Sequence, residues 1–112
     1  MEATFFGQID TEIQAGLLKL ARDSIKHGLE YGKPLEPDCL EQASILSKPG
    51  ASFVTLKMHE QLRGCIGSLQ GYRPLQNDVA ENAWSAGFRD PRFGQVTEAE
   101  YPQLVISISI LS

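Results

Sequence analysis

The residues best suited to chemistry are Arg63-Gly64-Cys65-Ile66-Gly67, which combine a guanidinium, a thiol and two glycines. The thiolate is the reactive form of cysteine, and a neighbouring Arg or Lys lowers the pKa of a thiol. Glycines leave room for a backbone or a ligand to approach closely, so Gly64 and Gly67 are predicted to give access to the thiol. Cys65 is therefore the candidate nucleophile.

Two strands are predicted to position this thiol, one over residues 53–58 and one over residues 62–69. If the turn between them centres on Glu60, Cys65 lies opposite Thr55, Arg63 opposite Lys57 and Gly67 opposite Phe53. Side chains alternate between the faces of a strand. One face is then apolar (Val54, Leu56, Met58, Leu62, Ile66) and the other polar (Thr55, Lys57, Arg63, Cys65).

A structural interpretation competes with the chemical one, because cysteine also behaves as a small hydrophobe that fills a crowded sheet. A nucleophilic cysteine usually needs a base, but His59 is four strand positions from Cys65, or about 13 Å at ~3.3 Å per residue. We therefore expect no Cys-His-Asp triad. Two cysteines and two histidines without paired spacing predict no metal site, and we expect no cofactor.

A second candidate is the turn Asp90-Pro91-Arg92-Phe93. Its structural interpretation is that Asp90 turns the chain and pairs with Arg92. In the functional interpretation Arg92 joins Arg63 around an anionic ligand. Four of the five arginines but no lysine fall in residues 63–92, and arginine suits bidentate contacts with carboxylates and phosphates.

The remaining elements predict an α+β fold, a mostly antiparallel sheet with helices packed on it. Apolar periodicity indicates a helix over residues 11–31, a second after Pro74 to residue 88, and a final strand over residues 104–111. Residues 37–47 are predicted as a short helix or irregular segment. Trp84 points away from the apolar side of its helix and is expected to pack against residues 90–93 or against residues outside the chain.

Composition limits the function classes. The chain has 112 residues and a net charge of −4, which suits one soluble domain over 1–112 and disfavours nucleic acid as a partner. Nothing resembles a membrane span or a signal peptide, so we expect a cytoplasmic protein without a membrane partner. Cys39 has no basic neighbour and is interpreted as packing.

Four segments in order, FVTLK, LRGCIG, DPRF and ISIL, resemble the AMMECR-type domain family. The resemblance implies an α+β fold and a functional cysteine, but it carries no established reaction. The family's domain continues past the position of Ser112, so the domain is expected to be incomplete at its C-terminus. Prokaryotic relatives are often encoded beside Memo-type and radical-SAM proteins, which the resemblance implies as pathway partners.

The sequence favours two functions, and it leaves nucleotide or RNA binding as a third that the acidic composition weakens. The first is thiol-dependent chemistry on, or binding of, an anionic substrate at Cys65. The substrate-binding residues would be Arg63, Gly64, Gly67, Asp90 and Arg92. The second is a non-catalytic binding or scaffold module in which LRGCIG is structural and Trp84 faces a partner. Self-association through the apolar strand at 104–111 is also expected.

Overall fold

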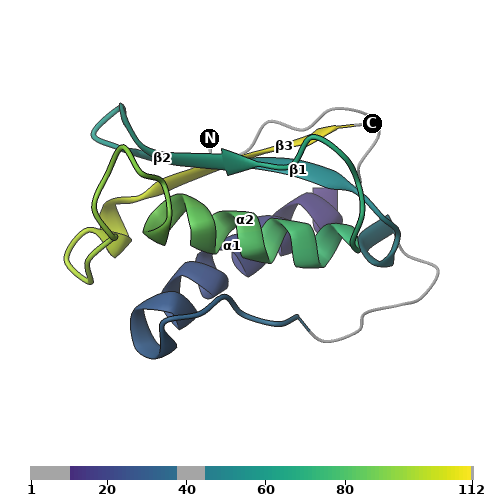
Figure 1. The fold of residues 1–112 in the computed structure, drawn as a ribbon, viewed down its shortest axis with the longest axis horizontal. Helices are drawn as coiled ribbons and strands as arrows, with labels where there is room; N and C mark the ends of the chain where they lie inside the picture. The colour runs from purple at the N-terminus through teal and green to yellow at the C-terminus, as the bar shows by residue number, and fades with distance from the viewer. Residues whose placement is uncertain (1–10, 38–44, 112) are drawn as a thin grey trace.

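Two helices pack on one face of a three-stranded antiparallel sheet, which confirms the α+β prediction (Figure 1). The computed structural model describes residues 11–37 and 45–111. The helices are α1 (Thr11–Tyr31) and α2 (Leu75–Phe88), and the strands are β1 (Ala51–Met58), β2 (Gln61–Gly67) and β3 (Val105–Leu111). Short 3-10 turns cover Ile45–Ser47 and Tyr101–Gln103. The strand order is β2-β1-β3, so β1 is central.

Helix α1 has the predicted bounds because its apolar residues recur with helical spacing. Leu17, Ala21 and Ile25 are at most 1% exposed and face the core. The helix stops at Gly32, whose φ of 76° is accessible to glycine. The N–H of Gly32 donates to the carbonyl of Gly28 at 2.9 Å and closes the last turn.

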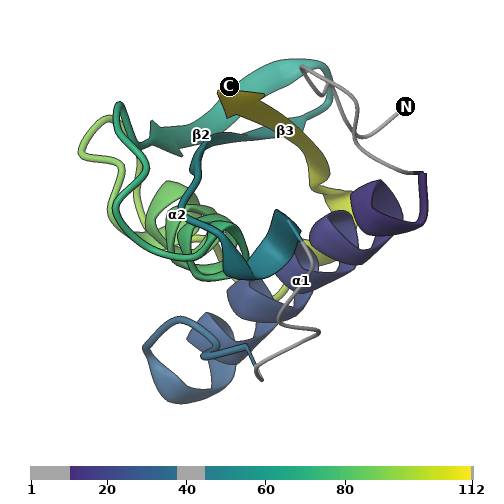
Figure 2. The ribbon, with the colours of Figure 1, turned by 90° about the vertical axis from the view of Figure 1, so that its right-hand side faces the viewer.

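Helix α2 lies close to the sheet because much of its buried side is small. Ala80, Ala83 and Ala86 are at most 1% exposed, and a Cβ added at Gly64 of β2 would lie 2.0 Å from the carbonyl oxygen of Ala86. Figure 2 shows both helices on the same side of the sheet, with α2 below β2 and α1 nearer β3. Gly64 is thus needed for helix-to-strand packing.

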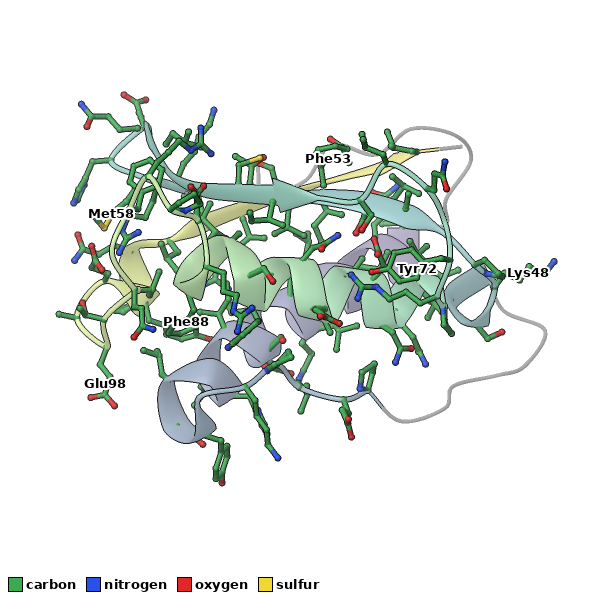
Figure 3. The ribbon with its side chains drawn as sticks, viewed as in Figure 1. Lys48, Phe53, Met58, Tyr72, Phe88 and Glu98 are labelled. Carbon is green, nitrogen blue, oxygen red and sulfur yellow. The ribbon has the colours of Figure 1, made fainter. Side chains whose placement is uncertain are left out.

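The described helices cover one face of the sheet. Val54, Leu56, Ile106 and Ile108 point toward the helices and are at most 1% exposed. No described helix covers the opposite face, where the strand side chains other than Ala51 are half-buried or exposed. These are Phe53, Thr55, Lys57, Cys65, Val105, Ser107, Ser109 and Leu111. We call this surface the open face; Figure 3 shows Phe53 on the side of the sheet away from the helices.

The hairpin register differs from the prediction near the turn. The turn residues are His59 and Glu60, so Lys57 lies opposite Leu62 rather than Arg63. Arg63 is an additional residue in β2, because the register shifts there and Leu56 pairs with Gly64. This β-bulge restores the predicted pairing of Thr55 with Cys65, and of Phe53 with Gly67.

The bulge also corrects two side-chain assignments. Leu62 was expected on the apolar face, but it lies opposite the exposed Lys57 and is 40% exposed. Arg63 was expected beside Cys65 on the polar face, yet as the bulged residue it has no partner in β1. An added residue changes the alternation of faces, which is why a pattern of period two fails here.

A buried carboxylate joins α2 to β1 and to the residue that follows β2. Asp78 is fully buried, and its Oδ2 accepts hydrogen bonds from the N–H and the hydroxyl of Ser52 in β1, both at 2.7 Å. Its Oδ1 accepts from the hydroxyl of Ser68 at 2.7 Å and from Nε of Arg73 at 2.9 Å. The donors are neutral groups and the Arg73 cation, so hydrogen bonds and an opposite charge compensate the burial of the Asp78 carboxylate.

Trp84 packs against helix α1, a partner that the sequence analysis did not name. Its indole lies against Gly28 of α1, where an added Cβ would come within 2.6 Å of Cδ1. It also stacks on Phe88, with ring centroids 6.2 Å apart and planes 28° apart. The missing side chain at Gly28 creates the space that the ring fills, so Trp84 joins the two helices.

The segment at 37–47 is only partly described. Residues 38–44, including Cys39, lie outside the described residues, and the 3-10 turn Ile45–Ser47 follows them. Among the described residues, no helix combines the length and apolarity needed to cross a membrane.

Candidate functional site

The carboxylate of Asp90 joins the two motifs that the sequence singles out. Its Oδ2 accepts a hydrogen bond from the backbone N–H of Cys65 at 3.0 Å and from Nη2 of Arg92 at 2.7 Å. Its Oδ1 accepts from both the N–H and Nε of Arg92 at 3.0 Å. Asp90 follows shortly after α2, so the packing of α2 on β2 brings the turn to the strand. Cys65, Asp90 and Arg92 therefore lie together.

The charges in this cluster stabilise each other. The hydrogen bonds from the Arg92 side chain hold the pKa of Asp90 well below its ordinary value, although burial opposes the shift. The same hydrogen bonds raise the pKa of Arg92, and the negative charge of a Cys65 thiolate adds a smaller contribution. The Asp90 side chain is 2% exposed, whereas that of Arg92 is 56% exposed. The arginine thus keeps one side toward solvent.

Cys65 is half-buried on the open face, and its Sγ lies 3.2 Å from Oγ1 of Thr55 across the hairpin. Neither histidine adjoins this pair in the structure. Nδ1 of His27 lies 2.8 Å from the carbonyl of Lys33 near the end of α1, and His59 is in the hairpin turn. The thiol has a hydroxyl as its hydrogen-bonding neighbour, not an imidazole.

The guanidinium of Arg63 is occupied by Glu100. Nε of Arg63 donates to Oε2 at 3.1 Å and Nη2 donates to Oε1 at 2.9 Å. The Arg63 side chain is 11% exposed, and its hydrogen bonds lower the pKa of Glu100 to about 2. This pair anchors the bulge to the loop that follows α2. Arg63 therefore acts as a structural ion pair in this geometry.

Phe93 and Glu100 are site neighbours that the sequence analysis did not assign. The Phe93 ring centroid lies 5.8 Å from Cζ of Arg63 and 5.5 Å from Cζ of Arg92. Both arginines thus lie near one aromatic ring, but each is paired with its own carboxylate. The spacing of Thr97 and Glu100 is that of a capping box, and the structure forms it, with the Thr97 N–H donating to Oε1 at 3.0 Å and the Glu100 N–H donating to Oγ1 of Thr97 at 3.2 Å. The capping-box spacing is the sequence feature that points to Glu100, but it does not indicate that Glu100 also pairs with Arg63.

The two glycines beside the thiol have tightly filled surroundings. A side chain at Gly64 would meet the backbone of Ala86, and one at Gly67 would lie 2.0 Å from Cδ1 of Phe53. The space that was predicted to admit a ligand is occupied by α2 and by an aromatic ring. Close packing is therefore enough to explain why glycine occupies both positions.

Across the described residues, no group of three or more His, Cys, Asp and Glu side chains could hold a metal ion. What the site offers is a half-buried thiol, a hydroxyl and an arginine fixed by a buried carboxylate. Fold and site together define an α+β domain in which a hairpin strand and the turn after the second helix share a Cys-Asp-Arg cluster.

The chain belongs to the AMMECR1 family, whose profile matches residues 18–112. A protein of Sulfolobus acidocaldarius is 34% identical and one of Saccharolobus solfataricus is 35% identical, over 93% and 94% of this chain. The crystal structure of an uncharacterized protein from Pyrococcus horikoshii superposes with a TM-score of 0.84 at 33% identity and covers 93% of this chain. The chain spans 47% of both relatives' length and 53% of that structure, about half in each case.

Proposed function

We propose that Cys65 is the centre of a thiol-dependent site for an anionic substrate, with Arg92 as the residue that meets the substrate's charge. One observation carries the proposal: the buried carboxylate of Asp90 binds both the backbone of Cys65 and the guanidinium of Arg92. A positioned cation beside a thiol favours the thiolate and attracts an anionic ligand.

The residues have distinct roles in this proposal. Asp90 is a positioning residue. Arg92 uses Nε and Nη2 on Asp90, which leaves Nη1 without a hydrogen bond to any described residue. The hydroxyl of Thr55 can donate to the thiolate. Arg63 contributes indirectly, because its pairing with Glu100 fixes the bulge next to Cys65.

A specific observation favours the second function, a non-catalytic binding or scaffold module. Arg63 and Arg92 both pair with carboxylates of the same chain, and both glycines of the motif are filled by packing. In that case the Cys-Asp-Arg cluster fastens the turn after α2 to β2. Memo-type and radical-SAM proteins stay predicted partners under either function.

Two alkylating agents of matched size separate the functions. Iodoacetate carries a negative charge and iodoacetamide is neutral, so the ratio of their rates at Cys65 measures the attraction for an anion. We expect a ratio about three to ten times that of glutathione, which Arg92→Gln reduces to the glutathione value. Mass spectrometry of the labelled peptide containing Cys65 gives both rates.

Arg89→Gln is the matched control, because Arg89 is an exposed arginine whose guanidinium lies over Trp84 rather than in the Cys65 cluster. It should leave the ratio unchanged. If wild type and Arg92→Gln give the same ratio as glutathione, the anion site is absent and the binding module is the better description.

A further inference from the structure

A cleft of about 310 Å³ opens between the C-terminal ends of α1 and α2. It is separate from the Cys65 cluster on the open face. Its walls include Gly28 of α1 and Gly32 just after that helix, Trp84 and Phe88 of α2, and Arg89 and Gln95 of the following loop. Figure 3 shows Phe88 below the sheet, away from Phe53. The volume is at the lower end of the ~300–1,000 Å³ typical of small-molecule sites.

The aromatic wall of this cleft is fixed by packing. Trp84 and Phe88 both lie against Gly28, since an added Cβ there would be 2.6 Å from an atom of either ring. Their own rings are stacked, with centroids 6.2 Å apart. A flat apolar group can therefore bind against a surface that needs no rearrangement.

Arg89 supplies an available cation at the same place. Its Cζ lies 5.1 Å from the centroid of the Trp84 ring, and its side chain has no ion pair with any described residue. Arg63, Arg73 and Arg92 are each paired with a carboxylate. The free guanidinium suits a bidentate contact with a carboxylate.

The end of α1 supplies the opposite polarity. Gly28, Leu29 and Gly32 line the cleft. The carbonyl of Gly28 accepts from the N–H of Gly32, whereas the carbonyl of Leu29 has no hydrogen bond with any described residue. The Leu29 carbonyl belongs to the negative end of a 21-residue helix that has no basic residue in its last turn, and it is an available acceptor for an ammonium group.

We propose that this cleft binds an α-amino carboxylate with a flat apolar side chain. The carboxylate pairs with Arg89, the ammonium group faces the Leu29 carbonyl at the end of α1, and the side chain lies against Trp84 and Phe88. The three features required by such a ligand are present within one cleft, and none of them is used by the Cys65 cluster.

Trp84 is the only tryptophan of the chain, so its fluorescence and its indole NMR signal report directly on the cleft. Titration of the full chain with phenylalanine should change both signals and saturate. 3-Phenylpropanoate lacks the ammonium group and phenethylamine lacks the carboxylate, so each should bind about tenfold more weakly or not at all. Equal binding of phenethylamine and phenylalanine would overturn the assignment of the carboxylate to Arg89.

Variants test the same assignment. Arg89→Gln should raise the dissociation constant for phenylalanine about tenfold, whereas Lys48→Gln, at an exposed lysine, should not change it. Cys65→Ser should bind phenylalanine like wild type, which separates this cleft from the thiol site. The proposal is wrong if phenylalanine produces no saturable change in either signal, or if Arg89→Gln binds it as tightly as wild type.

Discussion

Glu100 illustrates how one side chain can connect three parts of the molecule. Its Oε1 accepts hydrogen bonds from the N–H of Thr97 and from Nη2 of Arg63, while Oε2 accepts from Nε of Arg63. The carboxylate thus closes the capping box before the 3-10 turn Tyr101–Gln103 and also holds the bulge of β2. Because the charged form makes all these bonds, its protonation weakens them together.

This coupling predicts a pH dependence of stability. The pKa of Glu100 is lowered from 4.5 to about 2 in the folded protein, mainly by hydrogen bonds from Arg63. A lowered pKa means that the stabilisation is complete above the unfolded pKa of 4.5 and is lost as pH falls toward about 2. In wild type, we expect this group to account for about 2 kcal/mol of the unfolding free energy that is lost on acidification, after allowance for its partial exposure. Glu100→Gln should abolish that part of the loss.

Urea unfolding at several pH values between neutrality and acid measures this effect. Glu98→Gln, an exposed neighbour in the same loop, is the control and should retain the wild-type dependence. Parallel pH profiles for wild type and Glu100→Gln would contradict the role given to the Arg63 pair. Asp90 contributes in the same direction, but it is unchanged in all three proteins.

Gly64 gives a second test at this scale. Gly64→Ala places a Cβ 2.0 Å from the carbonyl oxygen of Ala86, and backbone cannot yield as a flexible side chain can. We expect a loss of about 1–3 kcal/mol in the free energy of unfolding, or more. Gly16→Ala is matched, since that glycine lies in α1 with nothing within 4 Å of the added Cβ. It should stabilise by about 0.5–1 kcal/mol, and a similar loss in both variants would argue against the contact.

Among the elements, the hairpin determines where the site residues lie. The turn residues His59 and Glu60 have φ of 53° and 65°, the sign required by the two-residue turns that match strand twist. Histidine is among the residue types enriched at positive φ, but glutamate is not, so the steric cost falls mainly on Glu60. With a two-residue turn, the pairing near the turn is one residue away from the predicted register. The bulge at Arg63 brings β2 back into the predicted register, so that Cys65 pairs with Thr55.

The strain in this turn predicts a stabilising substitution. Glu60→Gly should raise the free energy of unfolding by about 1 kcal/mol, because glycine adopts positive φ without a steric penalty. Gln61→Gly is the control one residue later, inside β2, where glycine should cost roughly 0.5–1 kcal/mol. Thermal unfolding of both variants decides the matter. A lower melting temperature for Glu60→Gly would show that the turn does not require this conformation.

For the molecule as a whole, the buried cluster around Asp78 fastens the start of α2 to the hairpin. Asp78→Ala leaves Nε of Arg73 and the N–H of Ser52 without their acceptor, and we expect a loss of about 3–5 kcal/mol in the free energy of unfolding. Asp23→Ala removes an exposed pair with Lys19 and should cost less than about 1 kcal/mol. Equal losses in urea unfolding would remove the special role of the buried carboxylate.

The sheet also predicts how the chain associates. Within the described residues β3 pairs only with β1, and its Val105 and Leu111 are 41% and 36% exposed. An unpaired apolar edge favours pairing with another chain. We expect these 112 residues to self-associate with rising concentration, as light scattering can show, and Val105→Lys with Leu111→Lys to reduce it. Leu69→Lys is the control, at a leucine that is 85% exposed and outside the strands, and it should have little effect on self-association. If the wild-type chain stays monomeric at all concentrations, the edge contact is excluded.

The sequence by itself determined the elements whose signals are local. The bounds of α1 follow from apolar spacing and from Gly32, and the alternation in β3 assigns Ile106, Ile108 and Ile110 to the core. The capping box of Thr97 and Glu100 is likewise a contact between near neighbours in the chain. Such features depend on periods of 3.6 or 2.0 residues and on turn chemistry, which are present in any folded context.

The tertiary structure alone decided which partner each polar group takes. Arg63 pairs with Glu100, 37 residues away, because a bulge releases it from the strand alternation. The N–H of Cys65 reaches Asp90, 25 residues on, because Gly64 lets α2 lie against β2 and carry the turn to the strand. Trp84 fills the space above Gly28 for a similar reason. These contacts join separate elements, so their geometry depends on how the helices pack on the sheet, and no local pattern encodes it.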